Sequence, residues 1–385
     1  MKRTAAVLVT AMALMAGCFP VLLDVRDGQV LIPRQEGVFS FDLKSGETVR
    51  VAERGQGDPA WACWSPDGAK ALVADVGENN KTTLRIVDVK THEASPLAQL
   101  EAAACVLWAP DSKSVSAAVV GMSGTQLKLI RLEDGQTKVL LDQALVMHAW
   151  LPDGKIIAFR VTEKKQDSQV VRGELVVVDP AGGEPRVVTT AMCDQSAILS
   201  VSLDGKQALV VETEVTGEGD EQQATTHLVQ VALADGAKQV LPATDALAAF
   251  WSPDGRRILI LKGSGGAAAQ AMGSMMGVPI AAEGPQIVVT DAEGKNAVLA
   301  ASNVLTHSGD MGGPAMYPCW ADNDTILYFV SAKTYGEAVT AVCLMSVKAD
   351  GSARKDLQAA IDNGVAQAAA PPALAAPAPA LERRP

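Results

Sequence analysis

Side chains that could bind a metal or a partner gather in the last third of this 385-residue sequence. They are Met272, Met275, Met276, His307, Asp310 and Met311. Thioether and imidazole groups suit Cu(I), so a copper site is one interpretation of this set. Methionine also occurs on adaptable contact surfaces, because its side chain is flexible and polarisable. We favour the second interpretation and predict a binding surface with no metal and no cofactor.

Other candidate chemistry is weaker. The acidic stretch from Glu212 to Glu221 lacks the ordered acidic spacing of a calcium loop, which favours a solvated run of charges. Gly121-Met122-Ser123-Gly124-Thr125 lacks the last glycine of a hydrolase nucleophile elbow. The four histidines have no pairing motif; they are His92, His148, His227 and His307. The sequence therefore predicts no catalytic residue.

The overall charge limits the choice of partner. The formal net charge is -11, and the chain has no cluster of basic residues. Nucleic acids and anionic lipid surfaces attract basic proteins, so this balance argues against both as direct electrostatic partners.

The N-terminus has the form of an export signal. Met1-Lys2-Arg3 is basic, and the apolar run from Ala5 to Met15 is too short to span a bilayer. Met15-Ala16-Gly17-Cys18 resembles the bacterial lipobox, with Met at the position where that motif prefers Leu. The resemblance implies that residues 1–17 are a lipoprotein signal peptide and that Cys18 carries the lipid. An ordinary secretory signal is the alternative.

The residue after Cys18 bears on the choice of membrane. It is Phe19 and not Asp, which by analogy with Gram-negative lipoproteins favours the periplasmic side of the outer membrane over the inner membrane.

The other cysteines have no metal-site spacing, so we expect buried thiols. They are Cys63, Cys105, Cys193, Cys319 and Cys343.

A repeated box organises the rest of the chain. Its best copy is Trp251-Ser252-Pro253-Asp254-Gly255, and close copies begin at Trp64, Trp108 and Trp150. Weaker copies occupy residues 201–205 and 320–324. The intervals are roughly 40 to 70 residues, near the length of one β-propeller blade.

The residue types in the box have a physical purpose. Ser, Pro, Asp and Gly in this order suit a type I turn, and the aliphatic run after each copy suits a strand that leaves a hairpin. The Trp before the turn is large enough to fill the space between neighbouring sheets. The pattern predicts a strand–turn–strand unit at each box.

A second signal, a strand followed by a polar turn, occurs seven times. Its first copy is 39–43 with Lys44-Ser45-Gly46, and its last is 342–347 with Asp350-Gly351. Because only six boxes are evident, the first unit must begin with the worn box Asp24-Val25-Arg26-Asp27-Gly28. We predict seven blades, with six as the alternative.

In a blade of four antiparallel strands, the box turn and the polar turn lie on one face of the disc. The remaining connections lie on the other face, where the longest insertions of units 4 to 7 fall. Loops on a rigid scaffold are the usual place for recognition, so this face is the predicted binding surface. Residues 358–385 are rich in Ala and Pro, which predicts a largely disordered tail with at most a short helix near its start.

The boxes resemble the propeller repeats of the TolB-like family over most of residues 21–357, although unit 5 lacks the Trp and unit 7 lacks the Pro and Gly. We therefore expect residues 18–357 to form the propeller domain. The resemblance implies an all-β fold, a single β-propeller of four-stranded blades. It leaves function open, because such repeats occur in scaffolds and in enzymes. We expect a monomeric, membrane-anchored periplasmic module that binds an envelope protein or a cell-wall component. A lyase or hydrolase with a site at the central channel is the alternative.

Overall fold

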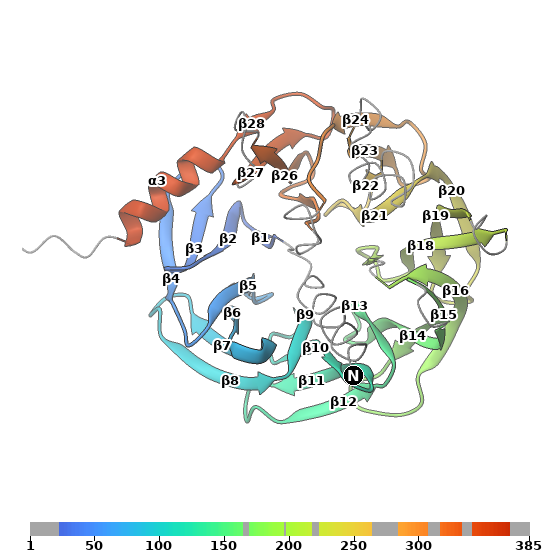
Figure 1. Cartoon of the computed structure of the whole chain (residues 1–385), viewed down its shortest axis with the longest axis horizontal. Helices are drawn as coiled ribbons and strands as arrows, with labels where there is room; N and C mark the ends of the chain where they lie inside the picture. Colours follow the sequence, from blue (N-terminus) through green and yellow to red (C-terminus); the bar gives the residue numbers. More distant parts are fainter. Residues whose placement is uncertain are drawn as a thin grey trace, which may run out of the picture.

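The computed structural model describes residues 23–164, 169–195, 198–217, 223–263, 284–306, 316–332 and 341–369. Their strands form seven sheets of four antiparallel strands, arranged in a ring around a central axis (Figure 1). Each sheet is built from strands that are consecutive in the sequence. The predicted all-β propeller with seven blades is confirmed, and the six-bladed alternative is wrong.

The first four blades have the following strands. Blade 1 contains β1 (Val25–Arg26), β2 (Gln29–Arg34), β3 (Gly37–Asp42) and β4 (Thr48–Glu53). Blade 2 contains β5 (Asp58–Trp64), β6 (Lys70–Val76), β7 (Thr82–Asp88) and β8 (Ala94–Leu100), with the short helix η1 (Glu78–Asn80) between β6 and β7. Blade 3 contains β9 (Ala102–Trp108), β10 (Ser114–Gly121), β11 (Gly124–Arg131) and β12 (Thr137–Leu141). Blade 4 contains β13 (Ala144–Trp150), β14 (Ile156–Lys164), β15 (Val170–Val178) and β16 (Arg186–Asp194).

The last three blades follow the same order. Blade 5 contains β17 (Leu199–Val201), β18 (Gln207–Thr216), β19 (Gln223–Ala232) and β20 (Lys238–Thr244). Blade 6 contains β21 (Ala246–Trp251), β22 (Arg257–Lys262), β23 (Gln286–Asp291) and β24 (Val298–Ala301). Blade 7 contains β25 (Cys319–Trp320), β26 (Thr325–Ala332), β27 (Ala341–Lys348) and β28 (Lys355–Asp356).

The worn box of the first unit forms a true hairpin. Val25 pairs with Val30 and Arg26 pairs with Gln29, so Asp27 and Gly28 are the two turn residues. Their φ angles are 50° and 81°, and positive φ at both positions is what a type I′ hairpin turn requires. The predicted start of the first blade is confirmed.

The hydrophobic core consists of layers between neighbouring blades. Leu31 and Val38 of blade 1, for example, pack with Ala71 and Val73 of blade 2 in one buried cluster. Similar clusters fill the other inter-blade spaces, including the one between blades 7 and 1. Each fully buried aliphatic side chain contributes about 1.5–3 kcal/mol, so the ring is stabilised mainly by contacts between blades.

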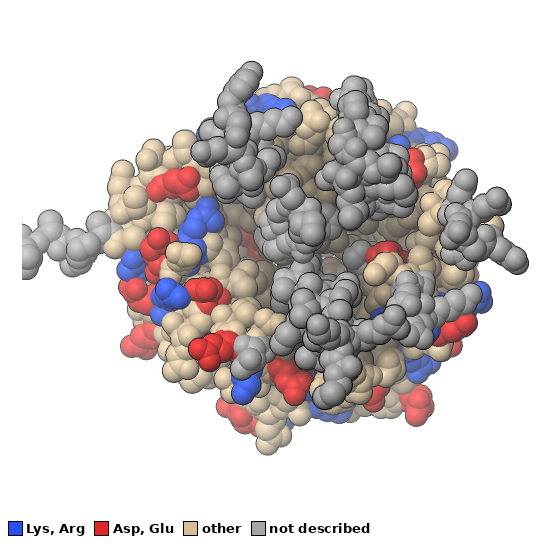
Figure 2. Space-filling view, in the orientation of Figure 1, with Lys and Arg blue, Asp and Glu red and all other residues tan. Residues whose placement is uncertain are grey.

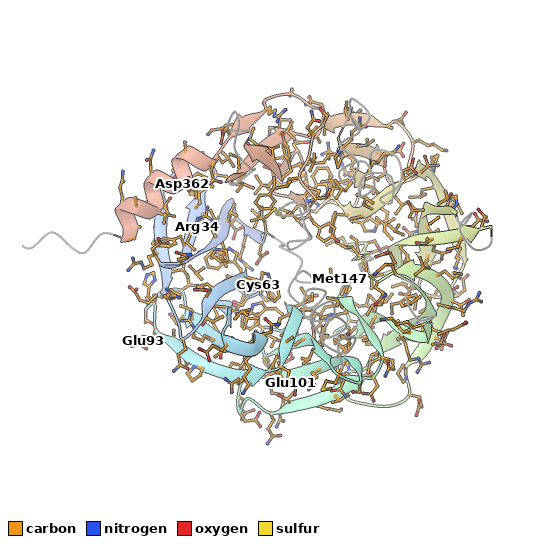
Figure 3. The ribbon with its side chains drawn as sticks, in the orientation of Figure 1. Arg34, Cys63, Glu93, Glu101, Met147 and Asp362 are labelled. Carbon is orange, nitrogen blue, oxygen red and sulfur yellow. The ribbon has the colours of Figure 1, made fainter. Side chains whose placement is uncertain are left out.

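A helix covers the place where the ring closes. Helix α3 (Gln358–Ala369) lies along the outer edge of blade 1, beside β4 (Figure 1). Its Ile361 and Val365 are buried against residues of blades 1 and 7. Arg34 of β2 reaches Asp362 of the helix, Nη2 to Oδ1, at 3.8 Å (Figure 3). Helix α3 thus forms from the start of the segment assigned to the tail, while residues 370–385 lie outside the described residues.

Candidate functional site

One face of the ring is made of uniform turns, and we call it the turn face. Its turns join the first strand of each blade to the second, as at residues 65–69, and the third to the fourth, as at 43–47. In the box turn of blade 2, Ser65 Oγ donates to Asp67 Oδ1 at 2.6 Å, and the same oxygen accepts from Ala69 N at 2.9 Å. These hydrogen bonds hold the pKa of Asp67 below its usual value. The turn carboxylates are therefore engaged in shaping their own turns.

The box tryptophans tie each blade to the one before it. Trp108 Nε1 donates to Cys63 O at 3.3 Å, and Trp320 Nε1 donates to Phe250 O at 3.2 Å. In both cases the acceptor directly precedes the Trp of the preceding box. The predicted position of Trp between neighbouring sheets is confirmed. Among the described residues, Trp251 is the exception: its buried Nε1 has no hydrogen-bond partner, and the preceding blade lacks the box Trp.

The opposite face, which we call the loop-rich face, carries connections of very unequal length. Between the second and third strands the connection is only residues 35–36 in blade 1 and 122–123 in blade 3, but 263–285 in blade 6 and 333–340 in blade 7. The connection from blade 6 to blade 7 spans residues 302–318. The added length therefore falls on one face and mostly in blades 6 and 7.

The residues predicted for binding belong to these long connections and lie outside the described residues. They are Met272, Met275, Met276, His307, Asp310 and Met311. Cys18, the predicted lipidation site, also lies outside the described part of the chain. These assignments stay predictions.

Apolar side chains of the inner strands form part of one large cluster. They are Leu107, Val146, Met147, Leu247 and Phe250. Met147 and Cys63 lie toward the centre of the ring (Figure 3). Tyr317 joins this cluster and meets Phe250 edge to face, with ring centroids 6.3 Å apart.

A serine and a histidine do meet in the structure, between blades 3 and 4. Ser116 Oγ lies 2.7 Å from His148 Nε2 and accepts from Trp150 Nε1 at 2.8 Å. Because His148 Nδ1 faces the carbonyl of Val146 at 3.4 Å, Nδ1 carries the proton and Nε2 accepts from Ser116. Burial lowers the pKa of His148 to about 4, so the imidazole is neutral.

This pair cannot act as a nucleophile and base in the described structure. Ser116 is 0% exposed and His148 is 1% exposed, so substrate has no access to the hydroxyl. The network instead joins β10 to β13. The residues are 32 positions apart in sequence, and no local motif links them, which is why sequence reasoning missed the contact.

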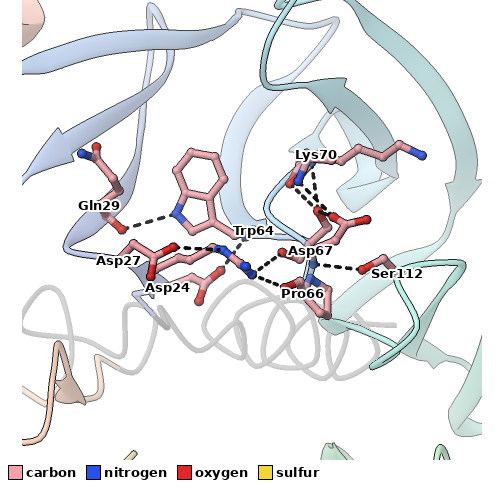
Figure 4. A network of polar contacts seen from close by, with 11 residues as sticks. Asp24, Asp27, Gln29, Trp64, Pro66, Asp67, Lys70 and Ser112 are labelled. Carbon is pink, nitrogen blue, oxygen red and sulfur yellow. Dashed lines mark hydrogen bonds and ion pairs between the residues drawn. The ribbon is translucent and has the colours of Figure 1, made fainter.

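A second polar site, half-buried, lies where the described chain begins. Asp24 Oδ2 accepts from Trp64 N at 2.5 Å, and Trp64 Nε1 donates to Gln29 O at 3.3 Å (Figure 4). Burial raises the pKa of Asp24 to about 6, although the Trp64 hydrogen bond and the Arg26 charge oppose the shift. Sequence reasoning noted the worn box but missed this contact: Val25 pairs with Val30 as Trp64 pairs with Ala71, so the Asp24 carboxyl lies directly before the strand position that holds Trp in the complete boxes.

Arg26 completes this junction on the turn face. Its Nη1 donates to Ser65 O at 2.8 Å and also to Pro66 O, so blade 1 holds the box turn of blade 2 (Figure 4). Desolvation raises the pKa of the Cys63 and Cys319 thiols, and the charge of Asp24 adds to the shift. These groups lie on the first strands of three consecutive blades, 7, 1 and 2.

On the side of the loop-rich face, a buried ion pair joins blades 1 and 2. Asp75 is 1% exposed and binds Arg85 through two hydrogen bonds, of which Nη2 to Oδ1 is 3.1 Å. Arg85 Nη2 also donates to Glu53 O at 3.2 Å. Gly55 packs over the pair, where a Cβ would come within 2.8 Å of Arg85 Nε. Both carboxylate oxygens of Asp75 are hydrogen-bonded to Arg85, so the role of the pair is structural.

The cysteines and acidic groups form no metal centre in the described part of the chain. Its five cysteines are free thiols, and Cys63, Cys105 and Cys193 are buried. No group of three or more His, Cys, Asp or Glu residues there is placed to hold a metal ion. Among the same residues, no helix has the length and apolar character needed to cross a membrane.

Fold and repeats together define the class of the protein as a seven-bladed β-propeller. No family model matches the chain, and no curated protein matches it. Solved structures do match, including TolB from Acinetobacter baumannii, with 14% identity, 69% of this chain covered and a TM-score of 0.45. The chain spans about 61% of the length of that TolB. The propeller fold that the TolB-like resemblance of the boxes implies is present in this chain.

Two other solved structures are similar in fold. The β-propeller domain of the Trilobed protease from Pyrococcus furiosus, which has an open velcro topology, is 12% identical, with 88% of this chain and 94% of that chain covered and a TM-score of 0.54. An oligogalacturonate lyase in complex with manganese is 14% identical, with 83% of this chain and 85% of that chain covered and a TM-score of 0.58. At these identities the likeness concerns the fold alone.

Proposed function

We propose that this protein is an extracytoplasmic propeller anchored to a membrane by a lipid, on the periplasmic side of the outer membrane if the cell is Gram-negative. It binds an envelope protein or a cell-wall component through the loop-rich face. The observation that carries this proposal is the asymmetry of the two faces. The turns of one face are nearly uniform in length. The connections of the other face differ in length, from residues 35–36 in blade 1 to residues 263–285 in blade 6.

A rigid propeller can carry longer loops on one face while its blades stay the same. Most residues of the inter-blade core lie in the strands, and Val304 and Tyr317 are core residues that lie in the connection from blade 6 to blade 7. A scaffold that keeps its turns short on one face and lengthens its loops on the other has the form of a recognition module. The lipobox-like Cys18 supports the anchor, because several acyl chains on one residue hold a protein durably at a membrane.

A capture experiment tests the proposal. The full-length protein is purified from its own envelope, and so is a variant in which residues 264–283 are replaced by a short Gly-Ser linker. A turn-face variant, Leu203→Ser, is the matched control, because Leu203 is 68% exposed on the opposite face. We expect a stoichiometric partner with the full-length protein and the control, and its loss with the loop variant.

All three proteins must melt at the same temperature for the comparison to hold. A partner that stays with the loop variant and leaves the Leu203→Ser control would place binding on the turn face and overturn the proposal. The absence of a stoichiometric partner from all three folded proteins would also overturn it.

A further inference from the structure

The direction of the first strand fixes which face a membrane anchor can reach. Strand β1 runs from the loop-rich face toward the turn face, because its hairpin turn at Asp27 and Gly28 is a turn-face turn. The backbone pairing continues upstream of β1, where Leu31 N donates to Asp24 O at 3.3 Å. The described chain therefore begins at Leu23, on the end of β1 that is directed to the loop-rich face.

Chain length then limits the distance between anchor and ring. Val25 pairs with Val30, and β2 runs from there to Arg34 at the rim of the loop-rich face, a rise of roughly 13 Å at about 3.3 Å per residue. From Val25 back to Cys18 the chain can span at most about 25 Å, at ~3.6 Å per residue. A lipid on Cys18 can therefore stand no more than about 12 Å beyond that rim.

We propose that the loop-rich face lies against the headgroup surface of the membrane, with the turn face directed to the aqueous compartment. This inference rests on the proposed lipidation of Cys18. It narrows the proposed function, because anything bound through the loop-rich face must then be reached at the membrane surface.

Charge supports a tether over electrostatic adsorption. Lys and Arg side chains are interspersed with Asp and Glu over blades 1 and 2, without an area of a single sign (Figure 2). The formal charge of the chain is -11, which gives no net attraction to anionic lipids. The short covalent link is what would hold this face in place.

Two exposed side chains provide a matched pair of probes. Met122 is fully exposed in the connection between β10 and β11 on the loop-rich face, and Leu203 is 68% exposed on the turn face. The variants Met122→Cys and Leu203→Cys are labelled with a small fluorophore on the full-length lipidated protein. The labelled proteins are reconstituted into phosphatidylethanolamine–phosphatidylglycerol vesicles that contain a headgroup-attached nitroxide quencher. The wild type, treated in the same way, gives the background from native thiols.

We expect the label at Met122→Cys to be quenched several-fold more strongly than the label at Leu203→Cys. Inserting a flexible Gly-Ser linker of about 20 residues between residues 22 and 23 adds a mean reach of ~25 Å, so this difference should disappear while the protein stays in the vesicle fraction. Equal quenching at the two positions without the linker, or stronger quenching at Leu203→Cys, would overturn the orientation.

Mass spectrometry of the N-terminal peptide shows whether Cys18 carries a lipid, and so tests the anchor separately from the orientation. A lipid on Cys18 with equal quenching rejects the orientation and leaves the proposed function standing. An unlipidated Cys18 rejects the anchor and the orientation together, and recognition through the loop-rich face is then judged by the capture experiment alone.

Discussion

A carboxyl group stands at Asp24, directly before the strand position that holds an indole in the complete boxes. The indole of a box Trp fills the space between two blades and hydrogen-bonds to the preceding blade, as Trp108 does to Cys63 O. Asp24 instead accepts the backbone N–H of Trp64 in the following blade. The first blade is thus joined to the second by a half-buried carboxyl, whose charged form is disfavoured by its partial loss of solvation.

The substitution Asp24→Asn should stabilise the protein at neutral pH. The pKa of Asp24 is raised to about 6, so the folded state holds the proton more tightly than the unfolded chain. The contribution of Asp24 is therefore complete below the unfolded pKa near 3.8 and is lost as pH rises to about 6. The loss has an upper limit of about 3 kcal/mol. Asparagine keeps the acceptor oxygen and cannot ionise. Urea unfolding should show the variant more stable than the wild type at pH 7.5 and nearly equal to it at pH 4.

Asp67→Asn is the control, with the opposite sign. Hydrogen bonds from Ser65 and Ala69 lower the pKa of Asp67, so its carboxylate stabilises the fold above the unfolded pKa and loses that effect as pH falls. The Asp67→Asn variant should be the less stable one at pH 7.5. If Asp24→Asn also lost stability at pH 7.5, the Asp24 carboxylate would be favourably placed, and its pKa would not be raised.

Among the elements, helix α3 has the closest fit to its neighbour. At Gly364, a Cβ would come within 2.6 Å of Thr48 Cβ on β4. The hydroxyl of Thr48 is buried beneath the helix with no hydrogen-bond partner among the described residues. The helix and the strand are therefore in direct contact, and this glycine permits it.

Gly364→Ala should destabilise the protein, although the same change in an exposed helix usually gains about 1 kcal/mol. The added methyl group has no room against Thr48, so the helix must move away from β4. Asn363→Ala, at an exposed position of the same helix, should be neutral or stabilise by about 0.5 kcal/mol. Thermal unfolding of both variants checks the pair. A Gly364→Ala variant as stable as Asn363→Ala would show that the helix does not pack as closely as described.

The elements that the sequence predicted are those whose signals lie within a few consecutive residues. The box turn and the polar turn each lie within a few residues, so their residue types revealed both the hairpins and the repeat. The helix after Leu357 was expected only as a possible short element, because its apolar positions Ile361 and Val365 become meaningful once β4 is beside them. The Ser116–His148 contact joins two blades, and no local sequence pattern predicts it.

At the scale of the whole molecule, the ring has a seam between blades 7 and 1, where the chain does not run directly from one blade to the next. Blades 7 and 1 each complete their sheets from their own segments, so closure depends on side chains and on helix α3. Phe39 of blade 1 and Leu344 of blade 7 share a buried cluster with Ile361 of the helix. Gln358 Oε1 also accepts from Leu344 N at 3.2 Å, just where the short strand β28 has ended. The helix therefore contacts both sides of the seam.

Removing residues 358–385 should loosen the seam and leave the rest of the ring intact. Burial of Ile361 and Val365 contributes about 3–6 kcal/mol in total, and its loss falls on blades 1 and 7 alone. Hydrogen exchange followed by mass spectrometry should show faster exchange in β1–β4 and β25–β28, with β13–β16 unchanged. A variant that lacks only residues 371–385 keeps the helix and should exchange like the full-length protein. Faster exchange spread evenly over all seven blades would mean that the ring opens as one cooperative unit, and the helix would then stabilise the whole propeller and not its seam.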